Sequence, residues 1–470
     1  MSHWQGKRVI IIGAARQGIA MARYLVNHGA NIVINDRRPE SEFLTIRQSL
    51  SDLPIEWVFG GHPIELLDRA DIVCLSAGVP LSLPIIIEAR KRNIPLFNDS
   101  QIFLEDTRCQ VVGITGSAGK STTTTLVGRI ANASVTEMDG VSRKQVWVGG
   151  NIGSPLISIT DESQPEDLAI MELSSFQLEL MTQSPQVAAI LNITPNHLDR
   201  HKTMEAYTAA KANILKYQSP SDVAVLGYDD PGAWELRSQV TGRLVGFGLK
   251  EPPQGIPSVY LQDDDICLKF GAENVRLFSN QVISLRGEHN VLNILAACAI
   301  GFAAGLPLDS MRLGVEGFSG MPHRLEFVRS WGGADWYNDS IATAPERAMA
   351  AIRSFDEPLV LLVGGRDKDL PWDEFADLVK QRIDHVVLFG EAADQIRRAI
   401  ESQPIIKGSN HARPFTVTQC RGLREAVQSA AMCAENGDVV LLSPGGTSFD
   451  EFRDFEERGD AFKQWVKELP

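Results

Sequence analysis

The stretch Val111-Val-Gly-Ile-Thr-Gly-Ser-Ala-Gly-Lys-Ser-Thr122 indicates how this chain is organised. An apolar run of strand length, Val111 to Thr115, leads into a glycine-rich turn, and a helix is predicted over Ser121–Ile130. Backbone N–H groups of such a turn and of the helix N-terminus can wrap an anionic phosphate chain. Lys120 would then reach the terminal phosphates, and the hydroxyl of Ser121 would hold Mg²⁺.

This glycine-rich turn departs from the usual phosphate-loop pattern at one position. The first glycine of that pattern belongs at position 114, where the chain has Ile114, and Gly113 stands one place early. An ordinary glycine-rich turn between a strand and a helix is therefore the alternative. The pair Lys120-Ser121 at the start of the predicted helix favours the phosphate loop.

Strand, turn and helix alternate along the rest of the chain, which favours parallel sheets covered by helices. We predict an α/β protein with three domains, over residues 1–108, 109–319 and 320–470. Ligands of such sheets bind outside the carboxyl ends of the strands, so we expect the domains to share one active site. The other predicted strands are Arg8–Ile12, Asn31–Asn35, Ile72–Leu75, Leu168–Met171, Val187–Leu191, Leu359–Val363, His385–Phe389 and Asp438–Leu442.

The composition excludes several classes of protein. The 470 residues include 45 basic and 59 acidic side chains, which give a net charge of −14. An acidic surface repels phosphate backbones, so nucleic acid is not expected as a partner. The sequence contains no run of about 18 apolar residues and no signal-peptide core, so we expect no membrane insertion. Its six scattered cysteines are typical of reduced thiols, and we expect a cytoplasmic protein.

Two further strands are followed by polar side chains. Leu168-Ala-Ile-Met-Glu172 places a carboxylate where a phosphate-loop enzyme needs a second metal ligand, although many strands end in an acid without binding metal. The segment Asn192–His201 follows another strand and contains His197, whose neutral imidazole suits a second Mg²⁺. A lone histidine is more often structural than a ligand.

The N-terminal domain contains a partial dinucleotide-binding pattern. Gly13, Gly18 and Asp36 have the required spacing, but Ala15 replaces the middle glycine. A helix packed tightly on a strand explains the glycines equally well. A dinucleotide-dependent oxidoreductase is therefore an alternative function, and a nucleotide-switched scaffold without enzymatic activity is another. Asp36 could accept hydrogen bonds from a nucleotide, and Arg37 or Arg38 could meet a phosphate.

Together these segments resemble the Mur ligases. The resemblance covers nearly the whole chain, from about Val9 to about Phe462, and the motifs occur in the family's order. Gly149–Gly153 and Glu172–Glu179 are most similar to the branch of the family that adds glutamate. The motifs are Thr115-Gly-Ser-Ala-Gly-Lys-Ser-Thr122, Gly149-Gly-Asn-Ile-Gly153, Glu172-Leu-Ser-Ser-Phe-Gln-Leu-Glu179, His197-Leu-Asp199, Ala209-Ala-Lys211, His289-Asn290 with Asn293, Pro322-His-Arg324, Asn338-Asp-Ser340, Ser443-Pro444 and Phe455-Glu-Glu-Arg-Gly459.

The resemblance implies a Rossmann-like N-terminal domain that binds a UDP-substrate and a central P-loop ATPase domain with a mainly parallel sheet. It also implies a Rossmann-like C-terminal domain that binds glutamate and closes on ATP. The implied reaction belongs to peptidoglycan precursor synthesis. ATP phosphorylates the carboxylate of UDP-N-acetylmuramoyl-L-alanine, and the amine of glutamate, expected to be the D isomer, then displaces phosphate. We expect a monomer.

The resemblance further implies two Mg²⁺ ions and the residues that carry the chemistry. Ser121 and Glu172 would bind one ion, and Glu172, His197 and a carbamylated Lys211 would bind the other. Lys120 would neutralise charge on the phosphates. Lys120, Glu172, His197 and Lys211 are therefore the expected catalytic residues.

Three binding sets follow from the same resemblance. The expected ATP-binding residues are Gly116, Ser117, Ala118, Gly119, Lys120, Ser121, Thr122, Asn290, Asn293, Arg324 and Asp339. Those expected to bind the UDP-substrate are Gly13, Arg16, Gln17, Asp36, Arg38, Ser76, Gly78, Asn151 and Ser174. Those expected to bind glutamate are Thr343, Lys368, Ser448 and Phe455.

Two segments depart from the family's pattern where glutamate is expected. Ile341 stands where the family usually has a lysine, and Gly445-Gly446 stands in a segment that usually reads Ala-x-Ala. A variant branch that adds L-glutamate resembles this one, so L-glutamate is the alternative substrate. The departures do not touch the phosphoryl chemistry.

Overall fold

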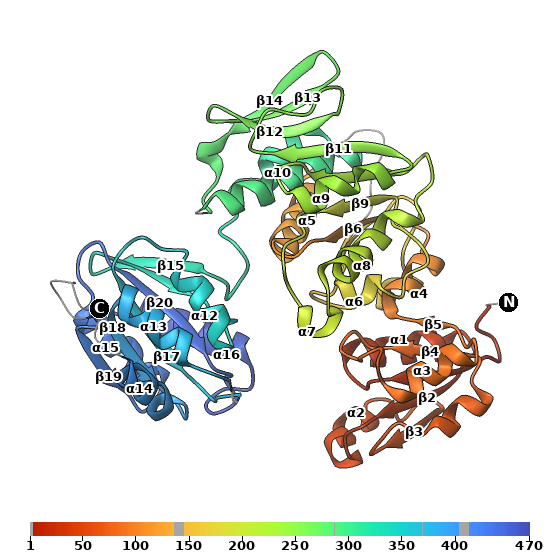
Figure 1. Ribbon diagram of the computed structural model, residues 1–470, viewed down its shortest axis with the longest axis horizontal. Coiled ribbons are helices and arrows are strands. Elements are labelled where there is room, and N and C mark those ends of the chain that lie inside the picture. The colour runs from red at the N-terminus through yellow and green to blue at the C-terminus, as the bar shows by residue number, and fades with distance from the viewer. Residues whose placement is uncertain (1–2, 136–144, 286, 369, 404–412) are drawn as a thin grey trace. The chain divides into compact units, whose positions relative to one another are not determined.

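The predicted strands lie in three sheets, which confirms the α/β class and the mainly parallel arrangement (Figure 1). The structure is a computed structural model that describes residues 3–135, 145–285, 287–368, 370–403 and 413–470. The chain divides into two compact units, residues 1–318 and 319–470. The first unit contains two of the sheets, and the second contains one. Among the residues described, no helix combines the length and the apolar character needed to cross a membrane.

The N-terminal sheet is parallel, in the order β3-β2-β1-β4-β5. Helix α1 packs on one face and α3 on the other, as the apolar clusters around Met21 and Ile85 show. The strand order reverses between β1 and β4, so the loops after these strands meet at a switch point, where ligands of such sheets bind. The elements are β1 Arg8–Ile12, α1 Arg16–Asn27, β2 Asn31–Asp36, α2 Leu44–Gln48, β3 Ile55–Phe59, β4 Ile72–Leu75, α3 Pro84–Lys91, β5 Leu96–Phe97 and α4 Asp99–Asp106.

The central sheet has the order β14-β13-β12-β11-β10-β9-β6-β8-β7, and only β13 runs antiparallel to its neighbours, β12 and β14. In β6, Val112 and Ile114 pack on the cluster that includes α5, whereas Val111 faces the cluster that includes α8. Burial of both faces explains why these strands read as apolar runs. The elements are β6 Gln110–Thr115, α5 Lys120–Val135, β7 Val146–Gly150, β8 Leu168–Glu172, α6 Ser175–Leu178, β9 Val187–Ile190, α7 Leu198–His201, α8 Met204–Lys216, β10 Val223–Gly227, α9 Pro231–Glu235, β11 Arg243–Gly248, β12 Ser258–Gln262, β13 Asp265–Phe270, β14 Glu273–Ser279, α10 Glu288–Ala303 and α11 Leu308–Val315.

The second unit is a sheet in the order β15-β16-β20-β17-β18-β19, in which only β15 is antiparallel. Apolar clusters cover both faces, one with α12 to α14 and the other with α15 and α16. The elements are β15 Glu326–Trp331, β16 Ala334–Asn338, α12 Pro345–Ile352, β17 Leu359–Gly364, α13 Asp373–Arg382, β18 Ile383–Phe389, α14 Ala393–Ser402, β19 Thr416–Gln419, α15 Leu423–Cys433, β20 Val439–Gly445 and α16 Phe455–Glu468.

Candidate active site

The glycine-rich turn between β6 and α5 is held by the segment that follows β9. The amide nitrogens of Ser117 and Ala118 donate to the backbone and side-chain oxygens of Asn192, at 3.0 and 2.8 Å. Gly119 has a left-handed φ of 81°, and a Cβ there would collide with Oδ1 of Asn293. The turn is therefore fixed in shape before any ligand binds, and it requires glycine at position 119.

Helix α10 places the two predicted asparagines beside this turn. Thr123 of α5 donates to Oδ1 of Asn293 at 3.4 Å, and Asn293 donates to Oδ1 of Asn290 at 3.2 Å. The structure thus brings together Asn290 and Asn293 with the turn Gly116–Gly119, although they are about 170 residues apart in sequence.

Lys120 folds back over the turn that precedes it. Its Nζ donates to the carbonyl oxygens of Gly116 at 2.8 Å and of Ser117 at 3.3 Å. The positive charge therefore already lies on the loop where phosphates are expected. A small movement of a flexible side chain would transfer it from the carbonyl oxygens to an anion.

Ser121 and Glu172 form the centre of the predicted metal site. The hydroxyl of Ser121 donates to Oε2 of Glu172 at 2.7 Å, and Asn151 Nδ2 donates to Oε1 at 2.8 Å. Glu172 is only 1% exposed, at the carboxyl end of β8 beside β6. A hydroxyl and a carboxylate at one sheet edge are oxygen ligands of the kind that Mg²⁺ prefers.

Lys211 of α8 is buried beside the same turn, with 1% of its surface exposed. Its Nζ donates to the carbonyl of Gly116 at 2.8 Å and to Thr115 Oγ1 at 3.3 Å, and it lies 4.8 Å from the ring centroid of Tyr207. Burial, and then the positive charge of Lys120, lower the pKa of Lys211 to about 7, although Glu172 opposes the shift. A substantial fraction of this amine is therefore neutral near pH 7.

His197 precedes α7 with left-handed backbone angles, φ 53° and ψ 32°. Its exposed ring lies edge-on to Phe176, with the ring centroids 5.2 Å apart. Among the described residues, no three His, Cys, Asp or Glu side chains form a group that could hold a metal ion. In the described part of the chain, the unmodified side chains near Glu172 thus form no complete set of anionic metal ligands.

At the N-terminal switch point, Ser76 Oγ donates to the carbonyl of Gly13 at 2.8 Å, and Gln17 accepts from the amide of Ala77 at 3.2 Å. A Cβ at Gly18 would collide with the Gly13 carbonyl oxygen. Close packing of helix on strand is therefore sufficient to explain both glycines. Gly78 lies in the turn after Ser76, and Arg16 is the first residue of α1.

Asp36 is fully engaged within its own domain. Arg38 donates to both of its carboxylate oxygens, at 3.0 and 2.9 Å, and the amide of Ala14 donates to Oδ2 at 2.9 Å. Burial opposes ionisation, but these hydrogen bonds outweigh it and lower the pKa of Asp36 to about 2. Asp36 therefore stays charged and holds Arg38 at the switch point.

In the second unit, Asp339 accepts hydrogen bonds from the amide of Leu325 at 3.2 Å and from Ser443 Oγ at 2.8 Å. Burial raises the pKa of Asp339 to about 7 despite these bonds. Lys368 Nζ donates to Thr343 Oγ1 at 3.2 Å, so two of the residues expected to bind glutamate are in contact.

The other predicted residues of the second unit lie near the same sheet edge. Ser448 is buried in the segment after β20, and Phe455 begins α16. Arg324 follows His323, which has a left-handed φ of 63°. Because Arg324 and Asp339 belong to this unit, their part in ATP binding stays a prediction.

Comparison with known proteins places these features in a family. The N-terminal domain described as Mur ligase MurD-like matches residues 7–98, the Mur ligase middle domain matches 114–301, and the Mur ligase glutamate ligase domain matches 323–446. A UDP-N-acetylmuramoylalanine–D-glutamate ligase of Symbiobacterium thermophilum is 38% identical over 463 residues, 98% of each chain. The ligase of the same name from Clostridioides difficile is 35% identical over 99% of each chain.

The chain belongs to the Mur ligase family.

Solved structures of other Mur ligases share the fold. UDP-N-acetylmuramate–alanine ligase MurC of Thermotoga maritima aligns over 98% of this chain and 99% of its own, with a TM-score of 0.55 and 19% identity. MurF of Acinetobacter baumannii aligns over 98% of this chain and 92% of its own, with a TM-score of 0.55 and 18% identity. At such low identity these likenesses concern the fold alone.

Several side chains that hold the sites of this Mur ligase were not among its predicted site residues. Asn192 fixes the phosphate loop, and Tyr207 OH lies 3.0 Å from Ser117 Oγ. Arg458 is fully buried in α16 and donates to Ser340 and to the carbonyl of Gly446. The signal for Arg458 is its position on the apolar face of α16, in line with Phe462 and Val466.

Proposed function

We propose that the chain is an ATP-dependent amide ligase that adds D-glutamate to UDP-N-acetylmuramoyl-L-alanine, with ADP and phosphate as the other products. The observation that carries this proposal is the alignment, along 98% or more of the chain, with ligases named for that reaction. The phosphate loop with its buried Glu172 provides the site that such a reaction needs.

The proposed reaction has two steps. A carboxylate oxygen of the UDP-substrate attacks the γ-phosphorus of ATP, and ADP leaves. The amine of glutamate then attacks the acyl carbon of the mixed anhydride, loses its proton and displaces phosphate. In the first step two anions approach each other, so opposing positive charge lowers the barrier. Lys120 supplies that charge in the loop itself.

We propose that Ser121 and Glu172 are Mg²⁺ ligands, because they present a hydroxyl and a buried carboxylate to one point at the sheet edge. When bound, the ion would neutralise the phosphate oxygens. Asn151 orients the carboxylate by binding its second oxygen. We propose His197 as a further ligand on the strength of the family resemblance.

Lys211 is the proposed site of carbamylation. A neutral amine adds to CO₂ and loses a proton, which leaves a carbamate with one negative charge shared by two oxygens. The lowered pKa of Lys211 provides the neutral amine, and burial shields the product from water. The carbamate would supply the oxygen ligands that the unmodified side chains lack, and nearby Lys120 would favour its negative charge.

Substrate recognition is proposed for the remaining predicted residues. Asn290 and Asn293 lie beside the phosphate loop and would bind the adenosine part of ATP, and Ser174 and Asn151 would contact the muramoyl part of the UDP-substrate. Ser174 also caps α6, since it accepts a hydrogen bond from the amide of Gln177 at 3.3 Å. Lys368 would pair with a carboxylate of glutamate.

The choice of glutamate isomer depends on the two segments that depart from the family pattern. The amide of Ile341 donates to the carbonyl of His323, and the amide of Gly445 donates to the carbonyl of Ala342. Gly445 has a φ of 68°, and a Cβ there would come within 2.8 Å of Trp372. Packing thus explains this glycine without reference to the substrate. We retain D-glutamate as the proposed substrate.

Phosphate release tests the function directly. Wild-type protein should release phosphate from ATP only with both UDP-N-acetylmuramoyl-L-alanine and D-glutamate present, and mass spectrometry should detect the amide. Faster release with L-glutamate would contradict the proposed isomer. Binding of NAD(P)H in a fluorescence titration, without phosphate release, would favour an oxidoreductase. Nucleotide binding without any product would favour a scaffold.

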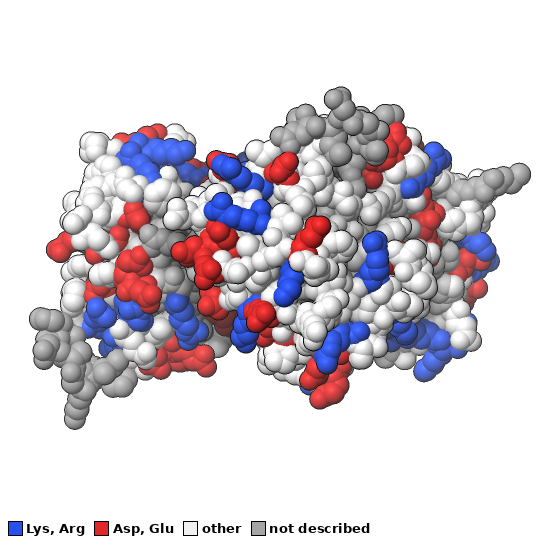
Figure 2. Space-filling model, turned by 90° about the horizontal axis from the view of Figure 1, so that it is seen from above, with Lys and Arg blue, Asp and Glu red and all other residues white. Residues whose placement is uncertain are grey.

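The compartment, the partners and the oligomeric state of the protein are also proposals. Five of the six free cysteines are buried and the sixth is half-buried, as expected for reduced thiols, which favours the cytoplasm. Basic and acidic side chains are interleaved on the face shown in Figure 2. We propose small molecules as the partners and a monomer as the working form.

A further inference from the structure

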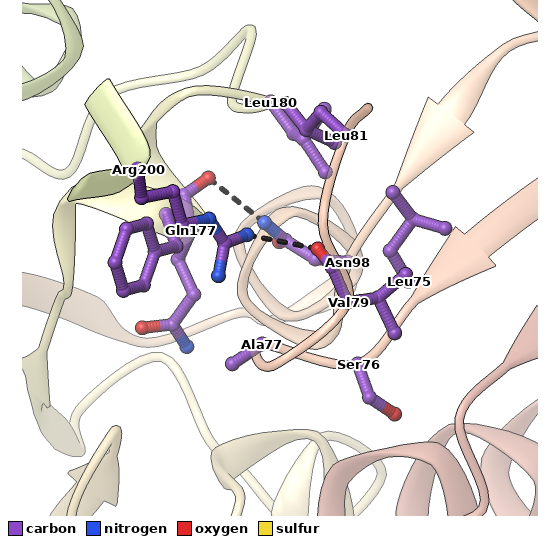
Figure 3. Close-up of a pocket in the computed structure, with 10 residues that line it drawn as sticks. Leu75, Ser76, Ala77, Val79, Leu81, Asn98, Gln177, Leu180 and Arg200 are labelled. Carbon is purple, nitrogen blue, oxygen red and sulfur yellow. Dashed lines mark hydrogen bonds between the residues drawn. The ribbon is translucent and has the colours of Figure 1, made fainter. Parts of the chain in front are cut away.

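Arg200 connects the two sheets of the first unit, and the proposed reaction assigns it no role. It lies in α7, the single turn that follows His197. Its Nη2 donates to the carbonyl of Val79 at 2.8 Å, across 121 residues of sequence (Figure 3). Its guanidinium carbon lies 3.7 Å from the ring centroid of Phe176. One side chain thus contacts the loop that follows β4 of the N-terminal sheet, through Val79, and helix α6, which follows β8 of the central sheet, through Phe176.

The contact with Val79 connects Arg200 to the loop that is expected to bind the UDP-substrate. The amide of Val79 donates to the carbonyl of Ser76 at 3.0 Å, which closes a turn over Ser76–Val79. Ser76 in turn donates to the carbonyl of Gly13, across the switch point. Arg200 therefore supports this loop at Val79, and it lines the small pocket at the loop together with Ser76.

The contact with Phe176 connects Arg200 to the helix that follows the predicted metal ligand Glu172. Phe176 lies in α6, which follows β8 and its terminal Glu172. Its ring is nearly parallel to that of His201, at 8° and 5.3 Å, and edge-on to that of His197. The guanidinium on Phe176 therefore completes a stack that fixes α7 and the turn bearing His197.

An arginine is suited to this position and a lysine is not. The planar guanidinium can stack on an aromatic ring and still donate to a carbonyl in its own plane. An ammonium group can make the hydrogen bond but not the stack. Arg200 is half-buried and close to Glu179: burial raises the pKa of that carboxyl, and the positive charge of Arg200 opposes the shift.

We infer that Arg200 is a positioning residue that sets the distance between the substrate loop Ser76–Val79 and the turn bearing His197. The inference rests on the proposed function. The UDP end of the substrate is expected at the first of these segments, whereas its carboxylate must reach the phosphate loop near the second. A displacement of about 1 Å between them can cost about 100-fold in rate. Arg200 should therefore act mainly on kcat.

The test measures Arg200→Ala and Arg200→Lys in the full chain. We expect kcat to fall by about 10- to 100-fold in both, because neither keeps the stack. KM for ATP and the dissociation constant for UDP, from calorimetry, should change less than threefold. Millimolar guanidinium should restore part of the activity of Arg200→Ala, since it can refill the space on Phe176.

Arg237→Ala is the matched control. Arg237 also lies over an aromatic ring, 5.4 Å from Trp234, and donates to the carbonyl of that residue, but it is away from the predicted site residues. Its loss should leave kcat unchanged, and guanidinium should not raise it. If Arg200→Ala does not fold, Phe176→Leu and Arg200→Lys provide the test. The double variant of Phe176→Leu and Arg200→Lys should lose less than the sum of the two single losses in activation free energy.

Two results would overturn the inference. One is wild-type kcat in Arg200→Ala, and the other is an equal loss of kcat, ATP affinity and UDP affinity, which indicates general damage to the fold. A wild-type chain that binds UDP but forms no amide contradicts the proposed function instead, and the inference with it.

Discussion

The turns after β1 and β6 have the same local design but different charged side chains. Each joins a buried parallel strand to a helix through glycines. The first turn carries a carboxylate, because Asp36 accepts the amide hydrogen of Ala14. The second carries two amino groups, because Lys120 and Lys211 both donate to the carbonyl of Gly116 at 2.8 Å.

The difference shows that glycine spacing predicts a turn, whereas the charged side chains at the turn select its ligand. A nucleotide on the β1 turn would find Asp36 as a charged hydrogen-bond acceptor and Arg38, its ion-pair partner, as a cation for phosphate. A triphosphate on the β6 turn would meet two amino groups. Close packing explains the glycines of the β1 turn, so their spacing does not by itself indicate a dinucleotide.

Removal of Lys120 should have the largest effect. We expect Lys120→Ala to lower kcat by about 100- to 1,000-fold, because a preorganised charge at the phosphates is lost. Phosphate release at saturating substrates measures this effect. Lys91→Ala, which removes an exposed lysine, is the control and should be active. Near-normal release from Lys120→Ala would contradict the proposed role of the β6 turn.

Lys211→Ala should have the second largest effect. We expect kcat to fall about 100-fold, which is the upper end of what supporting residues of metal sites contribute. Formate or acetate should restore part of the activity by filling the place of the carbamate. In wild type stripped of CO₂, reactivation at a fixed concentration of dissolved CO₂ should be faster at pH 8 than at pH 6, because the pKa of about 7 makes the amine mostly neutral only at the higher pH. Full activity of Lys211→Ala without additives would exclude the carbamate.

Asp36→Asn should have a smaller effect on the reaction. We expect KM for the UDP-substrate to rise about tenfold, because the charged hydrogen bonds that hold Arg38 are lost, with kcat nearly unchanged.

The same substitution should change the stability of the protein in acid. In wild type the unfolded carboxyl binds a proton more readily than the folded one, whose pKa is about 2, so the unfolding free energy falls as pH drops from about 4 to 2. Urea unfolding of the variant should lack this component, and an unchanged slope would contradict the pairing.

Gly18→Ala should affect stability and hardly affect catalysis. The added methyl group would collide with the carbonyl of Gly13, so we expect the free energy of unfolding to fall by about 1–3 kcal/mol. KM for ATP should stay within twofold of wild type. Gly78→Ala is the control for stability, because a Cβ there meets nothing within 4 Å. An unchanged stability of Gly18→Ala would remove the packing explanation for the β1 turn.

Several strands could be predicted because both faces of their sheets are buried, so an apolar run is itself the signal, although the equally buried β10 was not predicted. The prediction Arg8–Ile12 matches β1, and Val187–Leu191 differs from β9 by one residue. Helix α5 begins one residue before the prediction and extends to Val135. Such differences arise where hydrogen bonding, rather than composition, sets the end of an element.

The site could be predicted only where its residues are adjacent in sequence. Lys120 and Ser121 stand in one recognisable motif, whereas Arg200 reaches Val79 across the fold and has no local signal. Lys211 shows the limit most clearly. Its helix position alone fits a solvated lysine, yet the folded chain buries it, and only the family resemblance singled it out beforehand.

The second compact unit has consequences for how such enzymes diversify. It has apolar layers on both faces of its own sheet, and the chain passes between the two units once, at residues 318 and 319. A module with its own core can be transplanted with little disturbance to its host. Because the proposed glutamate-binding residues all belong to this unit, we expect a chimera that joins residues 1–318 to the corresponding module of another lineage to exchange the incoming amino acid.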